Sequence, residues 1–294
     1  MQTREGFTLN IPDKVVIDEM IHLVFLAEAG PVPDPAEKPF LVKIFAGAST
    51  RLNIVLHKQG SGVFLPAQIK TEFFLSEGAC VDYYQVEEPG IRGDFLTENN
   101  FYLKKHSSLD YFVLSAGDGF STSRTAVDFE EAHGFFSAKG ISILKQASTA
   151  AHHLTVSHKA PHCISRQYYK NILAGESRSE FVSLVHVCQG AVKSDSQQLN
   201  RNLLLSALAA AYSRPQLRID NDDVIATHGS ASGQLEDEEL FYLRSRGFSK
   251  ASARLVLIDG FAGEMTSEIH EKNLKTYLEN AIHQRVQAVA GGAS

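Results

Sequence analysis

The sequence lacks the short motifs that identify many enzymes. No G-x-x-x-x-G-K-[ST] segment and no G-x-G-x-x-G segment after a strand is present, so the chain has no phosphate-binding loop and should not hydrolyse ATP itself. No G-x-S-x-G nucleophile elbow occurs either. These absences exclude the commonest routes to phosphate or acyl transfer by this chain alone.

Cysteine is scarce. The three cysteines, Cys80, Cys163 and Cys188, lie far apart, and no C-x-x-C pair suggests a zinc ribbon or a dithiol redox site. A sparse, odd number of cysteines fits a reducing compartment. We expect each of them to be a small buried residue.

Long apolar runs and excess positive charge are also missing. No stretch is apolar enough to span a bilayer, and the first residues contain no apolar signal core and no Arg-rich presequence. The formal net charge of −6 argues against nucleic acid or an anionic membrane as a partner. With 294 residues, 44% hydrophobic and 21% charged, we expect a cytoplasmic globular protein with a sizeable core.

What the sequence does contain is a long series of strand-like runs separated by Gly, Asn, Asp or Ser. Before Asp237 almost nothing has helical periodicity, and residues 30–39, with four prolines, predict a loop. The runs allow a sandwich, a barrel or a parallel β-helix, and only residues 116–119 predict a tight hairpin. The many turns without a fixed hairpin length favour the β-helix slightly. The runs are residues 15–27, 40–45, 51–57, 69–75, 80–86, 111–115, 121–129, 154–158, 164–173 and 181–187.

The stretch from Ser194 to Gly247 connects this strand-rich body to a helical tail. Residues 194–202 are polar and predict a turn, followed by short strands at 203–205, 216–219 and 224–226. Thr227, His228 and Gly229 then suggest a turn that leaves an imidazole at the end of an element. There the imidazole could meet a partner as a proton carrier or metal ligand.

Three helices are predicted in the tail. The first spans residues 237–246 and is stopped by Gly247, and Ser249 caps the second. Ser267 can cap the third. A tail this short cannot enclose all of its apolar side chains, so part of it should dock on another surface.

Two other groups could bind metal. His152, His153, His158, His162 and Cys163 fall within twelve residues, but Ala160-Pro161 excludes a helix that would align them, and neighbouring strand residues face opposite sides. We therefore expect them to be strand and turn residues. Asp220, Asp222 and Asp223 lack a calcium-binding loop and suggest a solvated turn.

The order of several motifs resembles the SufD family of iron–sulfur cluster assembly proteins. The resemblance runs from about Arg124 to Met265. The related SufB proteins carry a cysteine near Asn200 and a glutamate where His228 stands, so the chain is more similar to SufD. The motifs are PHCISRQYYKNILAGESRSEF, SQQLNRNLLLS, PQL, DDV, HG, LFYLRSRG and ASARLVLIDGF.

This resemblance implies a mainly β fold. Residues 1–235 would form a right-handed parallel β-helix and residues 236–294 a small C-terminal helical domain. The additional N-terminal helical segment typical of the family is expected to be absent. Many relatives have a cysteine two residues before the histidine, where this chain has Ala226.

The resemblance also implies a function. The chain would be a non-catalytic scaffold that pairs with a SufB-like paralogue and binds a SufC-like ABC ATPase through its tail, at Phe241, Tyr242, Arg246 and Phe261. His228 would lie at the cluster-assembly interface and could contact iron. The resemblance implies no tightly bound cofactor, a transient iron–sulfur cluster in the complex, a possible reduced flavin (FADH2) and a possible homodimer of the isolated chain.

Two alternatives remain open at this point. A β-helix enzyme acting on polysaccharide would need two close carboxylates in an open cleft and is normally secreted. An interaction protein without cluster chemistry would bind the ATPase but would not need His228.

Overall fold

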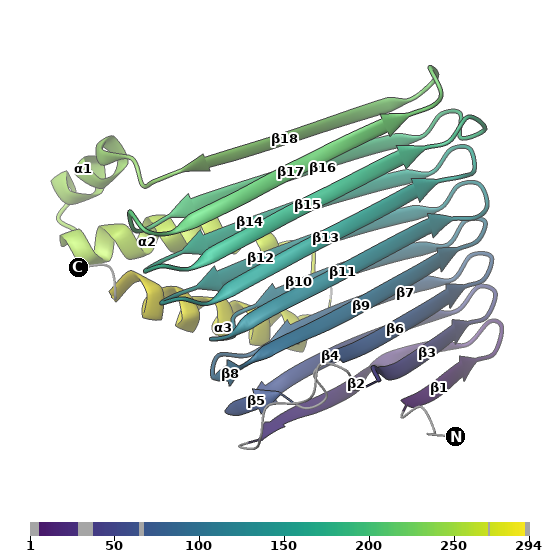
Figure 1. The fold of residues 1–294 in the computed structure, drawn as a ribbon, viewed down its shortest axis with the longest axis horizontal. Helices are drawn as coiled ribbons and strands as arrows, with labels where there is room; N and C mark the ends of the chain where they lie inside the picture. Colours follow the sequence, from purple (N-terminus) through teal and green to yellow (C-terminus); the bar gives the residue numbers. More distant parts are fainter. Residues whose placement is uncertain (1–5, 29–37, 65–67, 270, 292–294) are drawn as a thin grey trace.

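The computed structural model describes residues 6–28, 38–64, 68–269 and 271–291. These residues form two large sheets, with helices at the C-terminal end of the chain (Figure 1). The predicted proline-rich loop at 30–39 falls mostly outside the described residues.

The two sheets stand face to face and are parallel in almost every pairing. In spatial order, the eight-stranded sheet contains β1 (Gly6–Ile11), β3 (Phe40–Ala46), β6 (Gln68–Leu75), β9 (Asp94–Leu103), β11 (Phe120–Phe129), β13 (Thr149–His158), β15 (Arg178–Val187) and β17 (Ala210–Ile219). The ten-stranded sheet contains β18 (Ile225–Gly233), β16 (Asp195–Leu204), β14 (Ile164–Leu173), β12 (Phe135–Leu144), β10 (Ser108–Ser115), β7 (Cys80–Glu87), β4 (Arg51–Gly60), β2 (Val16–Glu28), β5 (Gly62–Phe64) and β8 (Ile91–Arg92).

From β9 onward, consecutive strands alternate between the two sheets, so the chain coils as a parallel β-helix and confirms the predicted fold class. The hairpin predicted at residues 116–119 is wrong. This turn joins β10 to β11, which belong to different sheets. The glycines of this turn allow neighbouring rungs to approach closely, because a Cβ on Gly117 would lie 1.9 Å from Glu87 Oε1.

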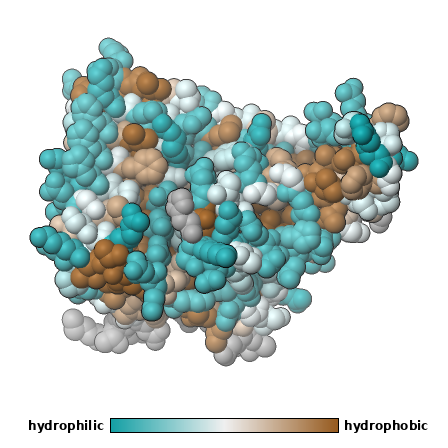
Figure 2. Space-filling model, turned by 180° about the vertical axis from the view of Figure 1, so that it is seen from behind, coloured by the Kyte–Doolittle hydropathy of each residue, from teal (hydrophilic) through white to brown (hydrophobic). Residues whose placement is uncertain are grey.

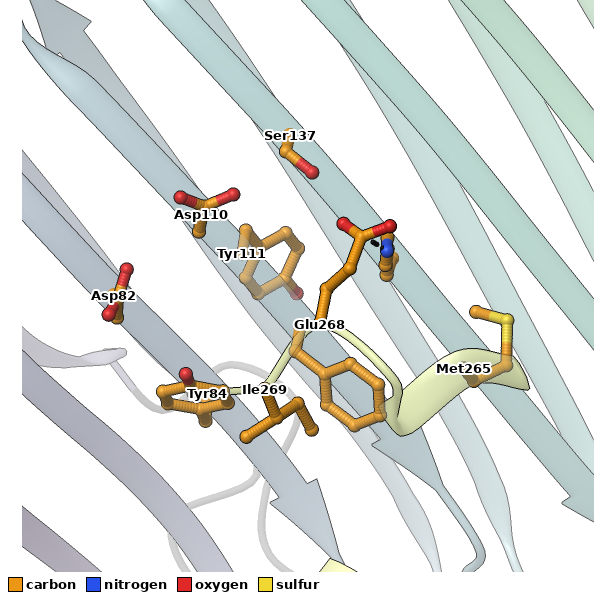
Figure 3. A pocket seen from close by; sticks show the side chains of 10 residues that line it. Asp82, Tyr84, Asp110, Tyr111, Ser137, Met265, Glu268 and Ile269 are labelled. Atoms are coloured by element: carbon orange, nitrogen blue, oxygen red, sulfur yellow. Dashed lines mark ion pairs between the residues drawn. The ribbon is translucent and has the colours of Figure 1, made fainter. Parts of the chain in front are cut away.

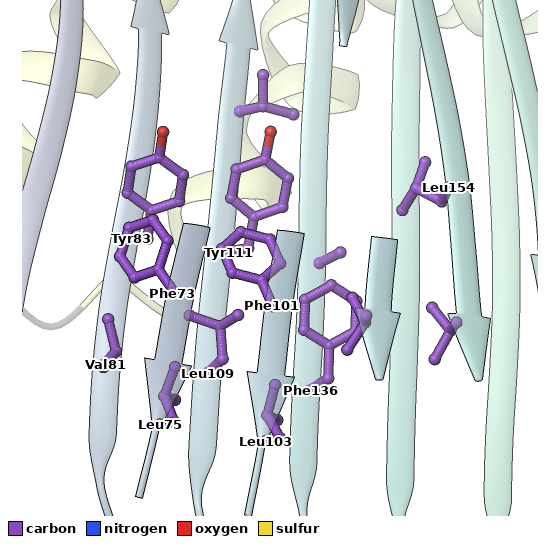
Figure 4. Close-up of a cluster of buried hydrophobic side chains, with 14 of the residues drawn as sticks. Phe73, Leu75, Val81, Tyr83, Phe101, Leu103, Leu109, Tyr111, Phe136 and Leu154 are labelled. Atoms are coloured by element: carbon purple, nitrogen blue, oxygen red, sulfur yellow. The ribbon is translucent and has the colours of Figure 1, made fainter. Parts of the chain in front are cut away.

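The middle of the β-helix interior is filled by apolar and aromatic side chains (Figure 4). Phe73, Tyr83, Phe101 and Tyr111 are almost fully buried and their rings lie against one another, with Tyr83 and Tyr111 stacked at 5.5 Å between centroids. Because parallel strands place equivalent residues of successive rungs side by side, each ring packs on the rung before it.

Closer to β18 the interior becomes polar. Ser196, Gln198, Asn200 and Asn202 all point inward from β16 and are buried. The turn predicted at residues 194–202 is therefore wrong. This segment is a strand whose interior face is polar, so it lacks the alternation of apolar residues that identifies a half-buried strand.

The helices are α1 (Asp237–Ser245), α2 (Lys250–Gly263) and α3 (Lys272–Gly291), with a short 3-10 turn, η1 (Glu264–Thr266), after α2. The side chain of Ser249 caps α2 as predicted. The predicted cap at Ser267 is wrong, because α3 begins at Lys272 and the Glu271 carboxylate accepts the amide hydrogens of Asn273 and Leu274.

Helices α2 and α3 lie against the outer face of the ten-stranded sheet and share a hydrophobic cluster with it. The buried Lys170 on β14 donates to the carbonyl of Phe261 (2.7 Å) and to Glu264 (2.5 Å). Arg285 on α3 is also buried and donates to the carbonyl of Ile143 (3.0 Å) and to Asp118 (2.8 Å). The division at residues 235 and 236 remains a prediction, since the tail and the sheet share this core.

Candidate functional site

The end of the β-helix formed by β17 and β18 is open. Each of these strands is the last of its sheet, so one side of its backbone has no neighbouring strand in the described chain. Large apolar side chains are exposed here, with Tyr212 53% and Ile225 66% accessible. An unpaired, partly apolar strand edge is a surface that another strand can extend.

His228 is exposed on β18 at this open end. The prediction that it sits in a turn at the end of an element is wrong, because it lies inside the strand, paired in register with Gln198 of β16. Thr227, Gly229 and Ser230 carry no apolar strand pattern, and the strand forms because β16 templates it. Exposure of the imidazole agrees with its expected availability to a partner.

His228 continues a row of inward-facing residues that runs through the ten-stranded sheet. In register, this row consists of Tyr83, Tyr111, Ala138, Gln167, Gln198 and His228. All of its members before His228 are buried. The imidazole therefore stands over the mouth of the interior and not on the outer face of the sheet.

A hydrogen-bonded polar column lies directly below this mouth. Gln198 Nε2 donates to Ser183 Oγ at 2.8 Å, and Ser183 Oγ donates to Gln167 Oε1 at 2.5 Å. Sequence reasoning missed these residues because it interpreted the polar run before Leu203 as a turn. Several buried polar atoms of the described chain, among them two in this column, have no hydrogen-bond partner, and such atoms ordinarily bind ordered water. They include His152 Nδ1, His158 Nδ1, Gln167 Nε2, Asn171 Oδ1, Ser179 Oγ, Ser194 Oγ, Ser196 Oγ, Gln198 Oε1 and Ser213 Oγ.

The His228 side chain forms no hydrogen bond or ion pair with any other residue that the structure describes. Across the described residues, no group of three or more His, Cys, Asp or Glu side chains is arranged to hold a metal ion. Two residues before it stands Ala226, which offers no ligand atom. A single imidazole can supply one ligand, so any iron bound here would need its other ligands from a second chain.

The histidine-rich segment is dispersed by the fold. His152 is buried against Ser142 (3.1 Å), whereas His153 faces outward and pairs with Glu180 (3.1 Å), as expected for neighbouring strand residues. His162 is in a turn, and its ring stacks on that of His133 at 4.8 Å. The aspartates at 220–223 likewise form ion pairs, Asp220 with His186 and Asp223 with Lys193.

A second exposed surface is the helix α1. None of its residues is buried, and Phe241 and Tyr242 are 72% and 58% accessible. The Arg246 guanidinium lies 5.1 Å from the centre of the Tyr242 ring, so these predicted residues form one patch. In Figure 2 this end of the molecule projects from the body and carries apolar side chains. The patch has the composition of a binding hot spot.

Phe261 does not belong to the α1 patch. It is half-buried on α2, and the ammonium of Lys170 lies 4.6 Å from its ring centre. It lines a groove of about 500 Å³ between α1, α2 and the ends of β16 and β18, together with Glu236, Glu239 and Arg201. Two carboxylates beside a single guanidinium do not suit the pyrophosphate of a flavin, so this groove does not fit FADH2.

The structure is a parallel β-helix with a histidine exposed at an open strand edge. Residues 40–261 match the family described as SUF system FeS cluster assembly, SufBD core domain. The chain belongs to this family. No described helix has the length and apolar character needed to cross a membrane.

Curated relatives agree with this assignment. The iron–sulfur cluster assembly protein SufD of Escherichia coli (strain K12) is 40% identical over 138 residues, which is 47% of this chain and 32% of that protein. The SufBD family protein slr0076 of Synechocystis is 28% identical over 284 residues, 94% of this chain and 62% of that protein. The chloroplastic protein ABCI7 of Arabidopsis thaliana is 34% identical over 123 residues, 42% of this chain and 26% of that protein. The chain thus spans less than two thirds of the length of these relatives.

Proposed function

We propose that this chain is a non-catalytic scaffold subunit of an iron–sulfur cluster assembly complex. The observation that carries the proposal is an exposed histidine on the terminal strand of a SufBD-type β-helix, a strand whose outer edge has no neighbour in the described chain. The open end binds a SufB-like paralogue, and the helical tail binds a SufC-like ABC ATPase that supplies ATP hydrolysis.

A second β-helix is the partner that suits the open end best. Its own terminal strands would complete the hydrogen bonding of β17 and β18, and a similar register would continue the stacked rows. The exposed Tyr212 and Ile225 would then become buried, which supplies apolar area at the centre of the contact.

His228 would contribute one nitrogen ligand or a proton at the interface. Because Ala226 supplies no thiol, the soft ligands for nascent iron and sulfide must come from the partner. The cluster is then a product that is built between the chains and passed on. The α1 patch of Phe241, Tyr242 and Arg246 would meet the ATPase, so that its movements reach the interface through the tail.

The first prediction concerns His228. In the complex assembled by co-expression with a SufB-like and a SufC-like protein, His228→Ala should fold and assemble but lose most of the visible absorbance of the cluster. The measurement is gel filtration followed by an ultraviolet–visible spectrum and iron and sulfide analysis. The matched control is His106→Ala, another exposed histidine but in a turn away from β18. Normal cluster content in the His228 variant would contradict the proposed role and favour an interaction protein without cluster chemistry.

The second prediction concerns α1. Replacing Phe241 and Tyr242 together by serine should abolish co-purification of the ATPase while leaving the unfolding midpoint of the isolated chain unchanged, because neither side chain is buried. The control is Phe120→Ser, an exposed phenylalanine on β11. Retention of the ATPase by the double variant would show that another surface binds it.

The polysaccharide enzyme receives little support. Asp82 and Asp110 are neighbours in register on β7 and β10, and Glu268, whose carboxylate pairs with Lys139, lines the same pocket (Figure 3). The pocket that they line has a volume of about 40 Å³, well below the roughly 300–1,000 Å³ of ordinary small-molecule sites.

A further inference from the structure

One cysteine lies beside a histidine that is itself bound to a carboxylate. Cys188 directly follows β15 and Asp220 directly follows β17, and these strands are neighbours in the eight-stranded sheet. The pairing of Val187 with Ile219, and the hydrogen bond from the Asp220 amide to the Val187 carbonyl, bring the two positions together. His186 faces outward from β15 next to both of them.

The contacts have the order of a nucleophile, a base and an orienting acid. Nε2 of His186 lies 2.8 Å from Oδ2 of Asp220, and Sγ of Cys188 lies 4.0 Å from each ring nitrogen of His186. Hydrogen bonding from His186 lowers the pKa of Asp220, which keeps that carboxylate ionised. An ionised carboxylate holds the ring proton on Nε2, so Nδ1 retains its lone pair and can take the thiol proton.

In the part of the chain that the structure describes, the other two cysteines have backbone carbonyls and no histidine as hydrogen-bond partners. Cys163 is buried, its pKa is raised by burial, and its thiol donates to the carbonyl of Glu131. The Cys80 thiol donates to the carbonyl of Gly78, at 3.9 Å. Cys188 is half-buried, and Arg218, whose Nε is 3.6 Å from Asp220 Oδ2, is the register partner of His186 on β17. Cys188 therefore differs from Cys80 and Cys163 in having a histidine beside its thiol.

We propose that Cys188 is an activated thiol that accepts sulfane sulfur from a persulfide donor. The inference rests on the proposed function, because cluster assembly must be supplied with sulfur. His186 takes the proton from Cys188, and the thiolate attacks the terminal sulfur of the donor R–S–SH. The S–S bond of the donor breaks, R–S⁻ leaves and takes the proton from His186, and Cys188 becomes Cys–S–SH. The sum is Cys–SH plus R–S–SH giving Cys–S–SH plus R–SH, with no further oxidant or reductant.

The position of Cys188 suits this role. Asp220 begins the turn that leads from β17 into β18, and His228 is the fourth residue of β18. At about 3.3 Å per strand residue, His228 lies about 10 Å along β18 from the start of that strand. Sulfur held on Cys188 would thus be stored close to the end of the β-helix where the cluster is proposed to form.

The test uses the isolated full chain and resolves each cysteine by mass spectrometry. At neutral pH, iodoacetamide should alkylate Cys188 about tenfold faster than Cys80, since only the thiolate reacts. Inorganic polysulfide should add one sulfur atom to Cys188, and Cys188→Ser should remove this adduct. Equal alkylation rates at Cys188 and Cys80, or sulfur added equally to Cys80, would overturn the proposal.

Asp220 is a positioning residue in this scheme, and its variants separate orientation from folding. Asp220→Asn should slow alkylation of Cys188 and move the pH midpoint of that reaction upward, whereas Asp220→Glu should restore much of the rate. Asp222→Asn, in the same turn, is the matched control and should change neither. An unchanged pH profile in Asp220→Asn would refute the scheme. None of these measurements uses the assembled complex, so their failure leaves the scaffold role standing, and failure of the His228 experiment leaves the thiol reactivity standing.

Discussion

At the scale of single residues, two histidines inside the β-helix have pKa values far below the ordinary value for histidine. His152 and His158 are buried, and burial lowers the pKa of His152 to about 3 and that of His158 to about 4 from an ordinary value of 6.5. Both rings are therefore neutral in the folded protein near neutral pH. Each uses Nε2 to contact a serine hydroxyl, Ser142 or Ser165.

These two histidines predict acid sensitivity. Below pH 6.5 these two side chains bind protons in the unfolded chain, whereas in the folded chain His158 binds one only near pH 4 and His152 only near pH 3. The free energy of unfolding is therefore at its full value above pH 6.5 and decreases as the pH falls from 6.5 toward these values. The free energy of unfolding should fall by up to about 1.4 kcal/mol per pH unit for each histidine. Urea titrations across this range measure it. His152→Gln should reduce the slope, and the exposed His228→Gln should not. Equal slopes in all three proteins would contradict the assignment.

At the scale of elements, the helical tail is divided by its contacts. α1 has no buried residue, whereas α2 and α3 are held on the ten-stranded sheet by Lys170 and Arg285. Part of the tail was expected to dock on another surface. For α2 and α3 that surface is the ten-stranded sheet of the same chain. Among the three described helices, α1 is the one without a buried residue, and its exposed side chains are the ones proposed to bind a partner.

Removal of the Arg285 guanidinium should loosen α3. Arg285→Met would leave the Ile143 carbonyl and the Asp118 carboxylate without this donor, at a cost of about 3 kcal/mol in unfolding free energy. Urea unfolding measures the cost, and hydrogen exchange should show faster opening of α3. Gln284→Met, on the exposed side of the same helix, is the control. If both variants unfold at the same urea concentration, Arg285 does not hold the helix.

The sequence predicted some of these elements and not others, for physical reasons. Helices α1 and α2 and the strands with alternating apolar residues, such as residues 69–75, were predicted closely because local periodicity records which face is buried. β16 and β18 were not, because their form is imposed by the neighbouring rung and their inward residues are polar. His228 could be singled out from the sequence, but its place over the mouth of the interior depends on pairing with Gln198. The contact of His186 with Asp220 joins residues on different rungs, which spacing along the chain does not reveal.

At the scale of the whole molecule, the open end governs association. Without a paralogue, the exposed edge of β17 and β18 should pair with the same edge of a second copy, since identical edges are complementary. Light scattering should then show a dimer whose fraction grows with concentration. Ile225→Lys should shift the protein to monomer, because an edge lysine opposes strand addition. Phe120→Lys, on β11, is the control. A concentration-independent monomer would exclude this pairing.

The attachment of the tail at several rungs has a consequence for how this architecture can vary. Tyr277 on α3 contacts Glu88 and His57 beside β7 and β4, while Lys170 fixes the end of α2 on β14. A stacked coil on its own could gain or lose a turn freely, at about 4.8 Å each. Here the helical tail contacts the sheet at both β4 and β14. Inserting a turn between these strands would therefore break the contact at Tyr277 or the contact at Lys170. The helical tail therefore limits the number of turns that the β-helix can have between β4 and β14.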